Sequence, residues 1–489
     1  MTTKRSTAPQ LVARFALYSS LVIPAVVAAQ QTSPALSGPP SPSGSSVSTP
    51  DAGTDAQQAF PATLAGHAAL PALTLVKPPA DAPASLQTSG KYTSADLRRN
   101  DTPQSVEGKS FLSDKAVPRK TGVSLPFSGQ PVQGMSGIRH AGKGRYWVTS
   151  DNGFGAKADS PDAMLMFHEM EPDWKTGKVQ RLRTIFLSDP DRKLPFHIVN
   201  EGTDKRYLTG SDLDIESIQP VDDGFWLGDE FGPWLVKINR QGKVLEFVET
   251  EIDGKVIKSP DHYAVTTPAE PKAFSTQVRR SRGYEGMALS KDGRFLYPML
   301  EAAMWDEAGK RETDDKGREY LRILQYDLKE KRWTGRFWKY RLEANGHNIG
   351  DFNMIGADSA LVVERDNGEG LTSQACNGPA RPDCQNDPAR FKRVYRIEMS
   401  DADAQGFVQK AGYVDLLSIA DPDKRARVPT QDGVFSFPFV TIENVDQVDD
   451  EHIIVANDNN LPTSSGRKIG KNDDNEFILL KVPELLGGK

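Results

Sequence analysis

The sequence has little cysteine and little histidine, with two and seven residues respectively among 489. Zinc and copper sites are built largely from these side chains, and the histidines here show no paired metal-ligand spacing, so neither metal is expected. The two cysteines, Cys376 and Cys384, stand close together and are expected to form a local disulfide that shapes one loop. A metal site at these cysteines is the alternative, although no Cys-x-x-Cys pair or nearby histidine supports it.

Long apolar runs are also missing beyond the N-terminal region, so no later segment is expected to span a membrane. The N-terminus carries Lys4, Arg5 and Arg14, then an apolar stretch over residues 15–27, and small residues at Val27-Ala28-Ala29. This layout predicts a secretory signal peptide over residues 1–29, with an uncleaved membrane anchor as the alternative. We therefore expect an exported protein, periplasmic or extracellular, with no stable membrane insertion after cleavage.

The chain has no excess of positive charge, because its net charge is −6. An acidic exported protein is a poor candidate for binding nucleic acid or anionic lipid. It is a reasonable candidate for binding cations.

Large apolar side chains are scarce over residues 30–105, where Pro, Ala, Ser, Thr and Gly dominate. Such a composition offers little apolar surface to offset the entropy of ordering the chain. We expect a flexible linker there, with at most a weak strand near Leu73–Val76. The folded domain is expected over residues 106–489.

Long stretches with helical periodicity are absent from this domain, so little helix is expected. Short runs of apolar, aromatic and β-branched residues recur instead, for example residues 146–149, 225–227 and 453–456, and turn-forming Asp, Asn and Gly bracket them. This pattern is typical of an all-β fold. Five segments repeat one plan, in which a polar start, a strand, a tight turn, a second strand and a polar corner follow one another. A hairpin repeated around an axis predicts a β-propeller, with six blades expected and seven as the alternative.

The polar ends of these hairpins should gather at one rim, because a hairpin that goes out and returns places both ends on the same side. The corner residues are all oxygen donors: Asp151, Asn152, Asp214, Glu216, Asp229, Glu230, Glu285, Glu301, Asp351, Asn353, Glu364, Asp366, Asn367, Glu443, Asn444, Asp446, Asn457 and Asp458. Converging carboxylates repel one another unless cations neutralise them. Calcium accepts such oxygen ligands in irregular geometry. The alternative is that these residues only form turns at a solvated rim.

Several of these segments resemble a known family. They are Asp214-Ile215-Glu216-Ser217-Ile218, residues 225–233 and Tyr284-Glu285-Gly286-Met287-Ala288-Leu289, with further similarity at residues 134–138, 150–153, 365–368 and 443–460. Together they resemble the esterase-like/phytase-like family of exported proteins, over roughly residues 123–482. The resemblance implies a β-propeller with a calcium-dependent hydrolase activity. The substrate would be a small-molecule ester or a phosphoester such as phytate.

The predicted site follows from the corners and this resemblance. The expected calcium ligands are Asp151, Glu216, Asp229, Glu285, Glu301, Asp351, Glu364, Glu443 and Asp458. The expected catalytic residues are Glu230, Glu285 and Arg365. Other candidate cations for a phosphate are Lys468, Lys471 and the cluster Arg279, Arg280 and Arg282.

A calcium-bound water would attack a phosphomonoester, or the same ion would polarise the carbonyl of a carboxylic ester. A serine-hydrolase mechanism is not expected, because the sequence has no Gly-x-Ser-x-Gly elbow. The alternative function is a non-catalytic propeller that binds a ligand or a protein partner, since fold alone does not decide between these roles.

Overall fold

The computed structural model of the protein describes residues 57–94, 96–112, 117–266, 276–306 and 309–487. The predicted signal peptide and residues 30–56 of the predicted linker lie outside these ranges. Among the described residues, no helix is both long enough and apolar enough to cross a membrane. The helices described there are two short 3₁₀ turns, η1 (Ala84–Leu86) and η2 (Thr372–Gln374), which confirms the expectation of little helix.

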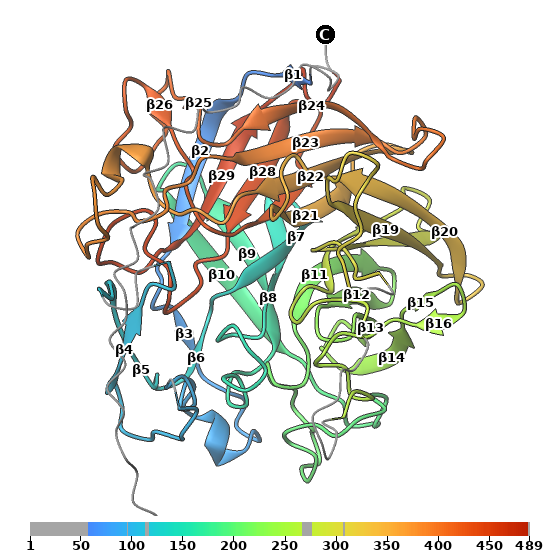
Figure 1. Ribbon diagram of the computed structural model, residues 1–489. Helices are drawn as coiled ribbons and strands as arrows, with labels where there is room; N and C mark the ends of the chain where they lie inside the picture. The colour runs from blue at the N-terminus through green and yellow to red at the C-terminus, as the bar shows by residue number, and fades with distance from the viewer. Residues whose placement is uncertain (1–56, 95, 113–116, 267–275, 307–308, 488–489) are drawn as a thin grey trace, which may run out of the picture. The chain divides into compact units, whose positions relative to one another are not determined.

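Most strands belong to five four-stranded antiparallel units, which we call blades (Figure 1). Blades 1 and 5 are joined into one sheet by a single parallel residue pair, Lys178 with Ala69. Blade 1 consists of β7 (Met135–Gly142), β8 (Arg145–Ser150), β9 (Met166–Asp173) and β10 (Lys178–Phe186). Blade 2 consists of β11 (Ile215–Val221), β12 (Gly224–Asp229), β13 (Trp234–Asn239) and β14 (Val244–Glu249). Blade 3 consists of β17 (Tyr284–Leu289), β18 (Phe295–Leu300), β19 (Tyr320–Asp327) and β20 (Arg332–Arg341).

Blade 4 consists of β21 (Asn348–Met354), β22 (Ser359–Arg365), β23 (Lys392–Glu398) and β24 (Gln409–Asp415), with β1 (Gln58–Ala59) added in parallel to β24. Blade 5 consists of β27 (Ile442–Gln447), β28 (His452–Asn457), β29 (Asn475–Lys481) and β2 (Thr63–Leu70). Short strands form the remaining pairs: β3 (Leu75–Val76) with β6 (Gln130–Pro131), β4 (Val106–Lys109) with β5 (Lys120–Leu125), β15 (Glu251–Ile252) with β16 (Lys255–Val256), and β25 (Ile419–Ala420) with β26 (Val434–Phe435).

The first strands of the five blades pack against one another in a closed cycle, β7–β11–β17–β21–β27 and back to β7. Sheets arranged radially in this way define a β-propeller, which confirms the predicted all-β propeller class. The expected six or seven blades are not confirmed, because the described strands form five. Loops and short pairs such as β15–β16 occupy the long intervals between the repeated hairpins.

Apolar layers between neighbouring blades hold the ring together. Leu361 of blade 4 belongs to the same buried cluster as Val445 and Ile453 of blade 5. Phe167 of blade 1 likewise belongs to one cluster with Phe225 of blade 2. The inner strands of the blades, such as β12 and β21, are therefore buried on both faces, which explains why they read as apolar runs rather than as strict alternation.

Strand β2 corrects the predicted linker. It pairs along its length with β29 as the outer strand of blade 5, so the blue N-terminal strand lies among red C-terminal ones (Figure 1). Leu64, Ala68 and Leu70 of β2 are buried. The linker prediction is therefore wrong for residues 57–105, although the weak strand expected near Leu73–Val76 is confirmed by β3. The reason is that β2 is rich in small residues and gains its burial from its partners' side chains rather than from large ones of its own.

The predicted Cys376–Cys384 disulfide is confirmed, with a Cα–Cα distance of 5.0 Å. It lies in the long connection between β22 and β23 of blade 4. It closes a local loop, as expected from the short separation of the two cysteines.

Candidate functional site

In each blade, the first strand departs from regular pairing with the second strand close to its start. The pairing of β11 with β12 shifts between Ile215 and Ser217, which leaves Glu216 outside the regular register. The same happens at Glu285-Gly286 in β17 and at Glu443 in β27. A β-bulge bends the strand locally and re-aims a side chain. In blades 2, 3 and 5 the re-aimed residue is a glutamate, and Glu216, Glu285 and Glu443 meet with ligand atoms within 4.8 Å of one another.

These glutamates belong to a pocket of about 290 Å³. Eight carboxylate residues line it: Asp151, Asp214, Glu216, Glu230, Glu285, Glu301, Glu443 and Asp458. All of them except Asp151 are buried. Corner residues of all five hairpins therefore meet at this pocket, and blade 4 contributes Asn367 rather than a carboxylate.

Two guanidinium groups line the same pocket and neutralise only part of the negative charge of its carboxylates. Arg365 donates from Nη2 to Glu443 at 2.9 Å and lies 3.4 Å from Glu301, while Arg282 forms an ion pair with Glu301. Two arginines stand against eight carboxylates, so the pocket as a whole remains strongly acidic.

The remaining carboxylates cannot all hold a negative charge side by side. Burial, followed by neighbouring carboxylates, raises the pKa values of Glu216, Glu230, Glu285 and Asp458 well above their ordinary range. Desolvation and the nearby Asp214 raise the pKa of Asp151 to about 8. These groups therefore take up either protons or cations at neutral pH.

The donor set fits a hard cation. Three overlapping groups bring ligand atoms within 4.8 Å of one another: Asp214, Glu216 and Glu230; Glu216, Glu285 and Glu443; and Glu230, Glu285 and Glu301. Glu230 Oε1 and Glu285 Oε1 are buried without any hydrogen-bond partner. A buried polar atom is rarely left unsatisfied unless an ion, a water or a ligand completes it. Carboxylate oxygens without histidine or cysteine are the ligands that calcium prefers.

Three predicted calcium ligands do not line the pocket, because the backbone or a lysine uses their oxygens. Asp229 accepts hydrogen bonds from the backbone N–H groups of Asp214 and Gly232, both at 2.8 Å, and so orders its own corner. Asp351 accepts from the N–H of Val445 at 2.9 Å and thereby links blade 4 to blade 5.

Glu364 is the third. Its carboxylate pairs with Lys410 at 2.8 Å and accepts from the Tyr340 hydroxyl at 2.7 Å. Burial alone would raise its pKa, but Lys410 and His347 lower it to about 2. All three carboxylates are thus satisfied within the protein, and the sequence pattern could not distinguish them from the pocket residues.

Ten of the lining residues were not among the predicted ligands or catalytic residues, and two of them, Asp214 and Phe111, bear on the chemistry of the pocket. Asp214 lies two positions before Glu216. It was one of the oxygen-donor corner residues, and this is the sequence feature that could have identified it as a ligand. Phe111 lies between β4 and β5, outside every repeat, so no pattern pointed to it. Of the other candidate cations, only Arg282 lines the pocket.

Comparisons with known proteins agree with the motifs. The sequence model of the phytase-like family, described as esterase-like activity of phytase, matches residues 130–461. An uncharacterized secreted protein of Arthroderma benhamiae is 31% identical over 126 residues, which are 24% of this chain and 24% of that protein. The chain therefore matches only about a quarter of that relative's length.

Two solved structures are similar at low level. A luciferin-regenerating enzyme has 11% identity and a TM-score of 0.30, with 78% of this chain and 94% of the other covered. Sqt1 of Saccharomyces cerevisiae has 10% identity and a TM-score of 0.27, with 75% of each chain covered. Similarity this weak carries no argument about function.

Proposed function

The chain belongs to the phytase-like family, and on this premise we propose that it is an exported, calcium-dependent hydrolase of phosphomonoesters that acts at the acidic pocket. Export is supported by the N-terminal sequence pattern and by the relative named as a secreted protein.

One observation carries the proposal: eight carboxylates share one pocket with two arginines, and two of their oxygens are buried without a partner. Turn residues at a solvated rim would be exposed and hydrogen-bonded to their own loops. Buried unpaired carboxylates cost several kcal/mol each unless a cation or a proton compensates them. A pocket of this kind is therefore suited to binding a cation rather than to stabilising the fold.

Calcium bound there would hold phosphate oxygens and lower the pKa of an attacking water. The side chains around it have distinct tasks. Glu285 belongs to two of the three ligand groups and would hold the ion. Glu230, with its unpartnered Oε1, would accept the proton that the attacking water loses. Arg365 and Arg282 would hold the phosphate oxygens by charge-assisted hydrogen bonds as charge develops.

A phosphomonoester fits this pocket better than a carboxylic ester. A phosphate dianion needs several positive centres, and the pocket offers two guanidinium groups in addition to its cation ligands. A carboxylic ester needs one polarising centre for its carbonyl oxygen, so the second arginine would have no task. The non-catalytic alternative would use the same ligand groups without turnover.

The test is an assay panel on the purified protein with p-nitrophenyl phosphate, phytate and p-nitrophenyl acetate. Each substrate is measured with calcium, with chelator, and after calcium is restored. The proposal expects phosphate release that chelation abolishes and calcium restores. Hydrolysis of the acetate alone would favour the carboxylic-ester activity, and no hydrolysis of any substrate would favour a binding protein.

Two variants locate the activity. Glu230→Gln keeps the shape of the side chain but removes the proposed base, so kcat should fall by about 100-fold or more. Glu451→Gln alters an exposed glutamate that pairs with Lys481 at 3.3 Å, and it serves as the control. Equal activity of the two variants would contradict the proposed role of Glu230.

A further inference from the structure

Phe111 provides an exposed apolar side chain at the edge of the acidic pocket. Among the described lining residues, Phe111 and Val440 carry the large apolar side chains. Val440 is 3% exposed, whereas Phe111 is 50% exposed. An aromatic ring therefore stands at the mouth of a pocket that is otherwise built from charged and polar groups.

The backbone beside this ring is held in place. The N–H of Phe111 donates to the carbonyl oxygen of Thr463 at 3.1 Å, and the N–H of Ser110 donates to that of Arg119 at 2.8 Å. Ser110 Oγ also donates to Glu369 Oε1 at 2.8 Å, and Arg119 forms a buried ion pair with the same carboxylate. Single exposed apolar residues are common on protein surfaces, but this one lines a pocket and stands on a hydrogen-bonded backbone. A backbone that is ordered in advance reduces the entropy lost when a ligand packs against the residue it carries.

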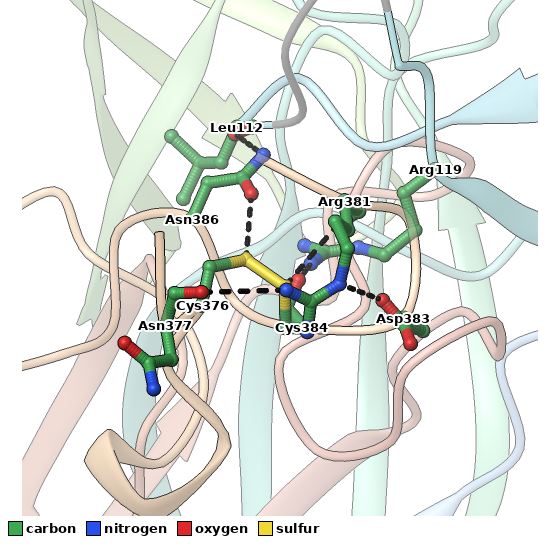
Figure 2. The surroundings of a disulfide bond; sticks show 8 residues. All are labelled: Leu112, Arg119, Cys376, Asn377, Arg381, Asp383, Cys384 and Asn386. Carbon is green, nitrogen blue, oxygen red and sulfur yellow. Dashed lines mark hydrogen bonds and ion pairs between the residues drawn. A yellow bond between two sulfur atoms is a disulfide. The ribbon is translucent and has the colours of Figure 1, made fainter. Parts of the chain in front are cut away.

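The disulfide loop contributes to this positioning (Figure 2). Asn386 Nδ2 donates to the carbonyl oxygen of Leu112, the residue after Phe111, at 3.4 Å. Arg119 Nη1 donates to the carbonyl oxygen of Cys384 at 2.9 Å. Cys384, at the end of the disulfide loop, and Asn386, two residues beyond it, therefore contact Arg119 and Leu112 near Phe111.

We propose that Phe111 is a specificity-determining residue and that the pocket prefers phosphomonoesters whose leaving group is an aromatic or other planar apolar group. This inference rests on the proposed function, since the phosphate is to be held by the pocket's cation and arginines. With the phosphate so held, an attached ring reaches the pocket mouth and packs against Phe111. A fully hydroxylated leaving group, such as an inositol, gains nothing from that ring. Aromatic pairs contribute binding energy beyond the area they bury.

The test measures binding without turnover, by calorimetric titration of the calcium-loaded protein with phenylphosphonate and methylphosphonate. The readout is the ratio of the two dissociation constants. The wild-type protein should bind phenylphosphonate more tightly, and Phe111→Ala should reduce the ratio by about three- to tenfold. Phe111→Tyr keeps the ring and should keep the ratio. Leu182→Ala, at a residue that is 43% exposed on β10, is the matched control.

A double variant, Cys376→Ser with Cys384→Ser, tests the support from the disulfide loop. The ratio should fall towards that of Phe111→Ala, while the affinity for calcium alone stays unchanged. An unchanged ratio in Phe111→Ala, with both phosphonates bound, would overturn the role of Phe111 and leave the proposed function standing. Failure of the calcium-loaded wild-type protein to bind either phosphonate would overturn both.

Discussion

The N-terminal strand β2 is predicted to be essential to the closure of the propeller, and Leu64→Ala tests this. Leu64 is 1% exposed and packs in the apolar cluster formed by blades 4 and 5. Its strand pairs with β29 from Thr63 to Leu70. Removing a buried leucine side chain costs the transfer energy of its methyl groups and leaves a cavity, which together destabilise a protein by about 3 kcal/mol.

Urea unfolding measures this cost. The midpoint for Leu64→Ala should fall, with the slope unchanged, by an amount that corresponds to this energy. Leu73→Ala, only nine residues further on, removes a side chain that is 55% exposed and should change the stability by about 0.5 kcal/mol or less. If the two variants unfold at the same midpoint, residues 63–70 do not close blade 5, and the flexible linker expected from the sequence is the better description.

The remaining predictions concern charged residues. Calcium at a thousandfold excess over its dissociation constant should stabilise the protein by about 4 kcal/mol against unfolding. Glu285→Gln should reduce the calcium-dependent rise in melting temperature, whereas Asp292→Asn, in an exposed turn, should not. An equal response of the two variants would contradict the role of Glu285 as a ligand. Glu364→Gln leaves Lys410 with a weakened buried partner and should destabilise the protein by about 3 kcal/mol without changing the calcium response; a lost response would place Glu364 at the site after all. Burial, followed by Glu369, raises the pKa of Asp473 from 3.8 to about 7, so the folded state holds a proton that the unfolded chain releases. The free energy of unfolding should therefore fall as pH rises from about 4 to 7, and Asp473→Asn should flatten that slope in urea titrations; an identical slope would refute the shift.

The repeated hairpins were predictable because each strand has two buried faces and each turn needs Asp, Asn or Gly. The same reasoning placed Glu216, Glu285 and Glu443 at one rim, where the structure brings them together. The bulges that aim them inward were not predictable, because a register shift depends on the partner strand rather than on local residues.

Other features depend on contacts between distant parts of the chain. The small residues of β2 gain their burial from β29, more than 400 positions away, so composition alone indicated a linker. Asp351 and Glu364 stand at corners like the others, but Val445 and Lys410 occupy their oxygens. Which group binds a given carboxylate depends on tertiary contacts, and the spacing of residues along the sequence does not reveal these contacts.

The most direct measurement is the amount of calcium bound per chain, determined by equilibrium dialysis of the chelator-treated protein at neutral pH. The site groups its carboxylates into three overlapping ligand sets, so the wild-type protein should retain at least one calcium ion per chain. A double variant, Glu230→Gln with Glu285→Gln, replaces both carboxylates that carry unpartnered oxygens by neutral amides and should retain markedly less. Equal calcium retention by the two proteins, or none by the wild type at millimolar calcium, would contradict a cation-dependent site in this pocket.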